Sequence, residues 1–264
     1  MPESSIEPTN LVAAGGIAAT MLSRHETVKP ATEITPIGLL ADEHGNVMNL
    51  DRFAITTDGS DPGPGLAVIG VVGASMNSGK TSMAAALIRG LVSAGLDVAG
   101  VKVTGTGSGG DLWLYRDSGA RLTLDFTDAG LASTYGVEPA DLLARSRRLL
   151  REAATSASVA VVEVADGLFQ PETAALMADP DFRGLFDGFM FAAPDPLSAL
   201  AGVDVLGRLG ITPLAVGGMV TRAPLSKAEA QRALGTEVLG LKTLADPATA
   251  IDLLAALTGA LVRA

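Results

Sequence analysis

Residues 66–82 read LAVIGVVGASMNSGKTS, and the rest of the chain is organised around this stretch. Its first part is an apolar run without polar alternation, which predicts a parallel strand covered on both faces. A segment rich in glycine and serine follows over 73–79 and leads directly into Lys80 and Thr81. The next apolar residues return with helical spacing: Met83, Leu87, Ile88 and Leu91. The stretch therefore predicts a strand, a glycine loop and a helix in succession.

That order, with Gly-Lys-Thr at the end of the loop, is the pattern of a phosphate-binding loop. Successive backbone N–H groups and the positive end of the helix surround a phosphate in such a loop. Gly79 lets the backbone approach closely, Lys80 adds a mobile positive charge, and the Thr81 hydroxyl can ligate Mg²⁺. The first glycine of the pattern is replaced by Ala74, which is tolerable if its φ is negative. We expect a nucleotide to contact a continuous run: Ser75, Met76, Asn77, Ser78, Gly79, Lys80, Thr81 and Ser82.

Composition narrows the class of protein. The chain has 264 residues and no cysteine, which excludes disulfides, thiolate metal sites and cysteine nucleophiles. A formal net charge of −10 argues against a nucleic-acid or anionic-lipid partner. No apolar run approaches the roughly 20 residues of a membrane span. The start, MPESSIEPTN, has no basic or apolar region of a secretory signal, so we expect a cytoplasmic protein that is not bound to a membrane.

The chain divides by composition into three parts. We predict a small N-terminal α+β module over 1–57, a Gly- and Pro-rich linker over 58–65, and a nucleotide-binding domain over 66–264. Within the module, the first ten residues are expected to be disordered, and 11–24 to form a short helix that begins at a glycine pair. Short apolar runs in 33–56 flank His44-Gly45-Asn46, which predicts a hairpin.

From residue 66 onward, apolar strand patterns alternate with helical ones. Strands are predicted at 66–72, 98–103, 122–126, 159–165, 189–192, 211–216 and 238–241. Helices are predicted at 80–94, 111–116, 139–154, 171–178, 196–209, 226–234 and 247–262. This alternation predicts the α/β fold of a P-loop NTPase, a parallel sheet with helices on both faces. The arginines of 139–154 are interpreted as a solvated face: Arg145, Arg147, Arg148 and Arg151.

Polar residues interrupt the predicted strands where ligands bind open α/β sheets, at the carboxyl ends. Lys102 ends the second strand, and Asp111 follows after a Gly/Ser/Thr loop. Glu163 lies in a buried strand, where a carboxylate is costly unless paired with a charge or bound to a metal. Thr81, Asp111 and Glu163 match the hydroxyl and carboxylate ligands of Mg²⁺. The alternatives are a salt bridge from Glu163 to Lys102 or Lys80, and a helix N-cap at Asp111.

Lys102 is the residue that we expect to take part in chemistry beyond nucleotide binding. Its apolar neighbours should partly desolvate the ammonium, which then needs anionic partners such as a γ-phosphate and an anionic substrate. We place it on the strand beside the phosphate loop. Lys80, Lys102 and Thr104 form the predicted catalytic group. The alternative for Lys102 is a structural ion pair with Glu163.

The order of these features resembles dethiobiotin synthetase and its ATP-dependent relatives over about residues 66–240. The resemblance implies that Lys102 holds a reacting carbamate and phosphate, that Asp111 and Glu163 are the metal carboxylates, and that the protein is a homodimer. The family's Glu-Gly-Ala-Gly-Gly is Glu-Val-Ala-Asp-Gly over 163–167 here. The two-part layout and the Gly-Thr-Gly loop are similar to the P-loop family that includes D-glutamate N-acetyltransferases.

Three classes of function fit these features. The first is an enzyme that uses Mg²⁺ and ATP, or another nucleoside triphosphate, to activate a small carboxylate, carbamate or hydroxyl substrate by phosphoryl transfer. The second is an N-acyltransferase whose phosphate loop holds the phosphates of coenzyme A. The third is a regulatory nucleotide-binding module. The catalytic lysine and the metal carboxylates favour the first class.

Overall fold

The computed structural model describes residues 7–13, 15–63 and 65–261. Its centre is a six-stranded sheet in which every pair of neighbouring strands is parallel. The strands lie in the order β6 (Leu122–Asp125), β5 (Val98–Lys102), β7 (Val159–Glu163), β4 (Ala67–Gly73), β8 (Gly188–Ala192) and β9 (Ala215–Gly217). The phosphate-loop strand β4 therefore lies in the interior of the sheet.

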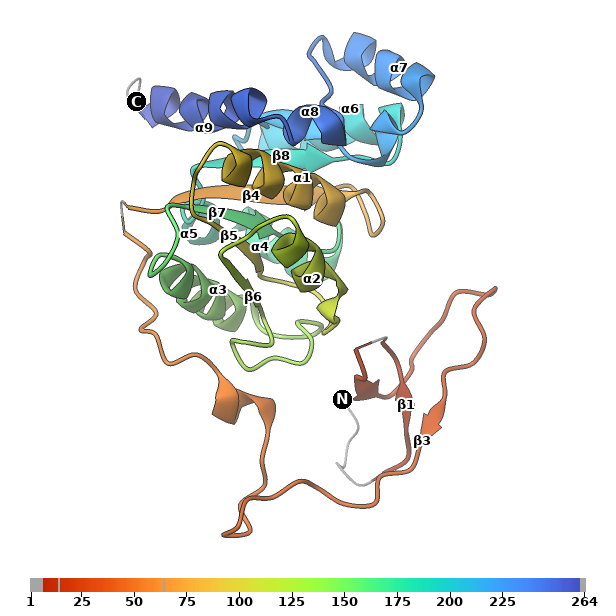
Figure 1. The fold of residues 1–264 in the computed structure, drawn as a ribbon. Coiled ribbons are helices and arrows are strands. Elements are labelled where there is room, and N and C mark those ends of the chain that lie inside the picture. Colours follow the sequence, from red (N-terminus) through yellow and green to blue (C-terminus); the bar gives the residue numbers. More distant parts are fainter. Residues whose placement is uncertain (1–6, 14, 64, 262–264) are drawn as a thin grey trace.

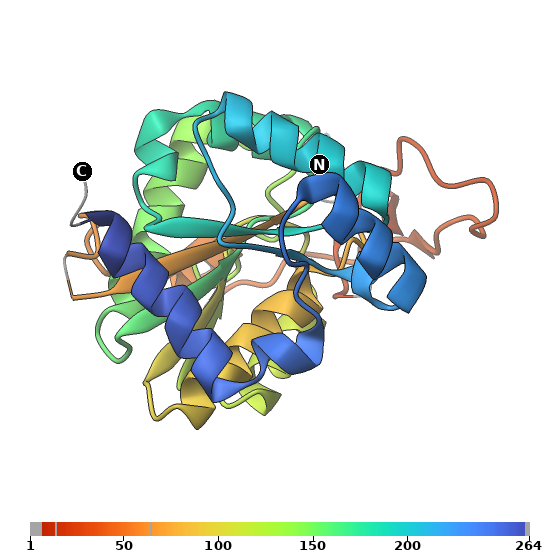
Figure 2. The same cartoon turned by 90° about the horizontal axis from the view of Figure 1, so that it is seen from above.

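Helices cover both faces of this sheet (Figures 1 and 2). One face packs against α1 (Lys80–Ser93), α2 (Gly109–Asp117), α8 (Leu241–Leu244) and α9 (Pro247–Leu261). The other packs against α3 (Pro139–Ala153), α4 (Pro171–Ala178), α5 (Pro180–Arg183) and α6 (Pro196–Arg208), and α7 (Pro224–Leu234) packs on α6. Alternation along β4 supplies both cores, because Val68 and Val72 join one cluster while Ile69 and Val71 join the other. The predicted fold class is confirmed.

Two strand predictions near the C-terminus are wrong in their bounds. The strand predicted at 211–216 begins only at Ala215, because Pro213 has no N–H to give to the ladder. The strand predicted at 238–241 is reduced to one bridge between Val238 and Val216, since the chain turns into α8 at Leu241. The described part of the chain has no helix with both the length and the apolar character that crossing a membrane requires.

The N-terminal segment contains a small antiparallel sheet instead of the helix predicted over 11–24. Its central strand β1 (Thr9–Leu11) pairs with β2 (Ala18–Ala19) and β3 (Glu33–Ile34). The glycine pair makes a tight turn: Gly16 has φ 87° and donates to the carbonyl of Ala13. Glycine at positive φ favours such a turn over a helix start. Of the first ten residues, expected to be disordered, 1–6 lie outside the described residues, and Thr9 and Asn10 belong to β1.

The hairpin predicted around His44-Gly45-Asn46 is confirmed as a narrow one. An antiparallel bridge joins Ala41 to Val47, and the N–H of Asp42 donates to the carbonyl of Asn46 at 3.0 Å. A 3-10 turn, η1 (Leu50–Phe53), follows.

The chain then runs beside α3, and this contact changes the interpretation of the arginine run. Arg145 pairs with Asp51 at 3.0 Å, Arg147 pairs with Asp61 at 3.0 Å, and Arg151 pairs with Asp58 at 3.8 Å. The prediction of a solvated arginine face is therefore wrong for Arg145 and Arg147, whereas Arg151 pairs with the segment over 51–61 while its side chain remains 40% exposed.

Candidate functional site

The loop between β4 and α1 has the backbone that its sequence predicts. Gly79 precedes the first residue of α1 and has φ 101°, a left-handed conformation that favours glycine. A Cβ at this position would also lie 3.0 Å from the Cα of Gly218 and from the N of Met219. The N–H of Met219 donates to the carbonyl of Ser78 at 2.9 Å. The loop that follows β9 thus closes directly onto the phosphate loop.

The alanine in place of the first glycine is accommodated as expected. Among the described non-glycine residues, the single positive φ is 62° at Asn77, so Ala74 has the negative φ that a side chain needs. The preceding residue, Gly73, is the position that has no room for a side chain. A Cβ on Gly73 would collide with the Ser78 hydroxyl and lie 2.8 Å from Cγ of Lys80.

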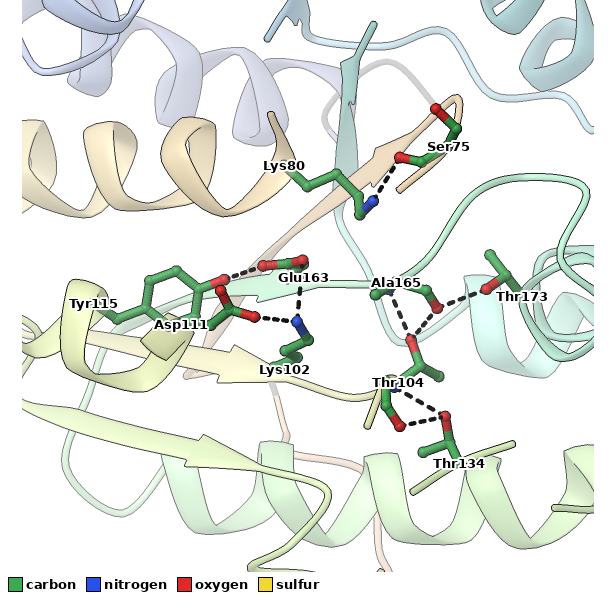
Figure 3. A network of polar contacts seen from close by, with 11 residues as sticks. Ser75, Lys80, Lys102, Thr104, Asp111, Tyr115, Thr134, Glu163, Ala165 and Thr173 are labelled. Atoms are coloured by element: carbon green, nitrogen blue, oxygen red, sulfur yellow. Dashed lines mark hydrogen bonds and ion pairs between the residues drawn. The ribbon is translucent and has the colours of Figure 1, made fainter. Parts of the chain in front are cut away.

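Lys80 points across this loop (Figure 3). Its Nζ donates to the carbonyl of Ser75 at 3.0 Å, and only 5% of the residue is exposed. Burial lowers the pKa of the Lys80 ammonium, and the charges of Glu163 and Asp166 offset that effect only in part. An anion placed in the loop would supply the missing charge partner.

The second lysine is not on the neighbouring strand, contrary to our prediction. The strands beside β4 are β7 and β8, and Lys102 lies on β5, on the far side of β7. Glu163 is opposite Val71 of β4 on one side and opposite Lys102 of β5 on the other. Glu163 therefore connects the phosphate-loop strand to the strand that carries Lys102.

Side chains from β5, β7 and α2 form one network, in which Glu163 and Tyr115 are buried and Lys102 and Asp111 are partly exposed (Figure 3). Lys102 donates to Asp111 and lies 3.5 Å from Oε1 of Glu163, while the Tyr115 hydroxyl donates to Oε2 of the same carboxylate. Burial lowers the pKa of Lys102, but Glu163 and Asp111 outweigh that effect and raise it above its ordinary value. The salt bridge from Glu163 to Lys102, one of the alternatives for Glu163, is thus present.

Tyr115 belongs to this network and was missed by our sequence reasoning. It lies one helical turn after Asp111 on α2 and is fully buried. Gly100 makes room for it, because a Cβ there would lie 2.8 Å from the Cβ of Tyr115. Burial and the nearby Glu163 raise the pKa of the phenol well above its ordinary value, so it remains a donor. The available signal was a hydroxyl-bearing aromatic residue four positions after a candidate carboxylate.

Two other predictions need correction. Asp111 is not a helix N-cap, because Ser108 occupies that position and Asp111 lies in the first turn of α2. Thr104, predicted to be catalytic, is 1% exposed, and its hydroxyl donates to the carbonyl of Ala165 at 2.6 Å while accepting from the N–H of Ala165 at 2.8 Å. Thr104 therefore binds the backbone of the segment after β7 and is not part of the cleft walls.

A cleft of about 450 Å³ opens beside the loop. Its walls come from the loop, from the network and from the segments after β7 and β9: Met76, Asn77, Gly79, Lys80, Thr81, Ser82, Lys102, Asp111, Glu163, Asp166, Met219 and Arg222. Of the predicted site residues, Ser75, Ser78 and Thr104 are not part of the walls. Asp166, Met219 and Arg222 were expected near the carboxyl ends of their strands but were not among the predicted site residues, because their approach to the cleft depends on how the loops after β7 and β9 fold back.

The donor set fits a hard cation that completes its shell with phosphate and water. The described residues contain no group of three or more His, Asp or Glu side chains that could hold a metal ion. The cleft does bring together two carboxylates and the Thr81 hydroxyl, which are ligands that Mg²⁺ accepts beside phosphate oxygens. The Lys102 ammonium already lies between the same two carboxylates as a positive charge.

The comparisons with known proteins add a likeness of fold. No family model matches the chain, and no curated protein matches it. Among solved structures, the signal recognition particle 54 kDa protein from Aeropyrum pernix K1, in complex with GDP, matches with a TM-score of 0.43 and 18% identity over 77% of this chain. The chain spans 50% of that protein's length. The hydrogenase maturation factor HypB from Archaeoglobus fulgidus matches with a TM-score of 0.41 and 14% identity, covering 75% of this chain and 91% of that one. Similarity at this level does not indicate what this chain binds.

Proposed function

We propose that this protein is a Mg²⁺- and nucleotide-dependent enzyme that activates a small carboxylate, carbamate or hydroxyl substrate by phosphoryl transfer. One observation supports this most strongly. Two lysines and three carboxylates line the same cleft as the phosphate loop: Lys80, Lys102, Asp111, Glu163 and Asp166. Phosphoryl transfer depends on positioning and on neutralising charge, and these groups serve both purposes.

Each residue has a distinct part in the proposal. The backbone N–H groups over 75–82 and the Lys80 ammonium hold the outer phosphates, because the N–H groups carry partial positive charge and the ammonium lines the cleft. Thr81, Asp111 and Glu163 hold Mg²⁺, which when bound neutralises the phosphate oxygens. Lys102 contacts the γ-phosphate and an anionic acceptor. ATP is the proposed nucleotide, and another nucleoside triphosphate fits the same phosphate contacts.

A thermal-shift panel tests the proposal. The purified protein is heated with ATP, GTP, CTP or acetyl-CoA, each with and without Mg²⁺. We expect a nucleoside triphosphate to raise the melting temperature, and Mg²⁺ to increase that rise, because a ligand that binds only the folded state stabilises it. Stabilisation by acetyl-CoA alone, independent of Mg²⁺, would favour the acyltransferase. No shift with any of these ligands would contradict the proposal.

A further inference from the structure

The structure places one cation where the proposed function requires another. The carboxylates that would hold Mg²⁺ both contact Lys102: Asp111 accepts a hydrogen bond from Nζ, and Oε1 of Glu163 lies 3.5 Å from it. Glu163 is 2% exposed and needs a counter-charge, and its ion pair with Lys102 supplies one. Two positive ions between the same carboxylates would repel each other strongly at this depth.

We propose that Lys102 is an internal counter-ion that occupies the metal position of the Asp111–Glu163 pair, so that its ion pairs and a bound divalent cation exclude each other. The inference rests on the proposed function for the identity of that cation. It combines the two sequence interpretations of Lys102: the structural ion pair exists without metal, and the lysine is released toward the cleft when metal arrives with the nucleotide.

The surroundings of Lys102 allow this exchange. Its side chain is 14% exposed and lines the cleft together with Lys80 and Thr81. Gly105, at φ 140°, leaves space for the stem, since a Cβ there would lie 3.0 Å from Cε of Lys102. A four-carbon stem can move its charge by rotamer changes alone. The released ammonium would then face the site of the phosphates.

Tyr115 restricts the exchange to one oxygen of the Glu163 carboxylate. Its hydroxyl holds Oε2 of Glu163, whereas Lys102 lies against Oε1. Because the phenol donates to Oε2 and the ammonium lies against Oε1, this hydrogen bond does not have to break when the cation at Oε1 changes. Lys80 does not substitute for Lys102 here, because its Nζ is bonded to the carbonyl of Ser75. The exchange therefore involves Oε1 of Glu163 and the carboxylate of Asp111.

The test is Mn²⁺ binding in the absence of nucleotide, followed by electron paramagnetic resonance. Unmutated protein should bind Mn²⁺ weakly, because Lys102 holds the position. Lys102→Met keeps the stem and removes the charge, so Mn²⁺ affinity should rise by roughly ten- to a thousandfold, the scale on which a neighbouring charge shifts the proton affinity of a carboxylate. Lys102→Arg keeps the charge and should remain as weak as the unmutated protein, as should Lys242→Met at an exposed lysine on α8.

Several results would overturn the inference. The first is a Mn²⁺ affinity of Lys102→Met that is no higher than that of the unmutated protein. The second is an increase in Mn²⁺ affinity that remains when Glu163→Gln is added to Lys102→Met. The third is an increase in Mn²⁺ affinity in Lys102→Arg. If Lys102→Met does not fold, the exchange is tested in the unmutated protein by NMR. The nitrogen signal of the Lys102 ammonium should shift when Mg²⁺ and ATP are added together. An unchanged signal at saturating Mg²⁺ and ATP would contradict the exchange. Failure of the proposed function is detected separately, because the thermal-shift panel would then show no effect of nucleotide. The Mn²⁺ experiment contains no nucleotide and would still test the exchange by itself.

Discussion

Glu163 of β7 and Lys102 of β5 are opposite each other in register, and their side chains form an ion pair of 3.5 Å at the carboxyl edge of the sheet. Since β7 also pairs with β4, this ion pair is one strand away from the phosphate loop. The buried Glu163 carboxylate thus interacts with the charge of Lys80 at the loop and with the charge of Lys102.

Lys80→Ala should abolish stabilisation by nucleotide and leave the fold intact. The side chain reaches over the loop, where it donates to the carbonyl of Ser75, so its loss removes the proposed phosphate contact without opening the apolar core. Turnover should fall as well, because the loss of one positioned charge contact costs about 2–4 kcal/mol of transition-state stabilisation. Nucleotide affinity is measured by calorimetry with Lys242→Ala as the matched control. Equal affinity in both variants would contradict the phosphate-loop assignment.

Tyr115→Phe should destabilise the fold by about 1–3 kcal/mol, because it removes the hydroxyl that bonds to the buried Glu163 carboxylate. Urea unfolding at neutral pH measures the change. Tyr135→Phe is the matched control, since Tyr135 is 72% exposed and should behave like the unmutated protein. Equal stability of the two variants would contradict a stabilising hydrogen bond between Tyr115 and Glu163.

Gly105→Ala should cost more stability than Gly45→Ala. Both residues have positive φ, at 140° and 81°, so both substitutions strain the backbone, by about 1 kcal/mol or more. A Cβ at position 45 has nothing within 4 Å, whereas at 105 it presses on Lys102 and on the ring of Phe126. Thermal unfolding compares the two. An equal loss would mean that the Lys102 stem has more room than the structure gives it.

Arg145→Met should loosen the segment over 51–61 from α3. The guanidinium is 17% exposed and pairs with both Asp51 and Asp141, so this contact is better shielded from salt than the more exposed pairs of Arg147 and Arg151. Limited proteolysis should cut this segment faster in the variant, and Arg147→Met should have a smaller effect. Identical cleavage rates in the three proteins would speak against the contact.

We propose that the protein is a homodimer, which is the commonest symmetric oligomer. Large apolar side chains are exposed at several helix starts and loops at the carboxyl edge of the sheet: Trp113, Phe169, Leu197 and Leu225. Light scattering at micromolar concentration should give twice the chain mass of 26.7 kDa. A mass equal to one chain would refute the proposal.

The strand, loop and helix over 66–93 were predictable, because local apolar spacing and the Gly-Lys-Thr sequence determine them. The approach of Lys102 to Glu163 was predictable as an alternative, since parallel strands end at one edge. The order of strands was not predictable, because it depends on which strands pair across distant parts of the chain. The hydrogen bond from the Thr104 hydroxyl to the carbonyl of Ala165 was not predictable either, because it forms only when β5 and β7 are paired.

A crystal structure with Mg²⁺ and a non-hydrolysable ATP analogue tests the central claim most directly. We predict that the phosphates contact the backbone over 75–82, that the metal contacts Thr81, Asp111 and Glu163, and that Lys102 has left the two carboxylates for the γ-phosphate. A nucleotide bound with both carboxylates far from its phosphates, and with Lys102 still between them, would contradict the account.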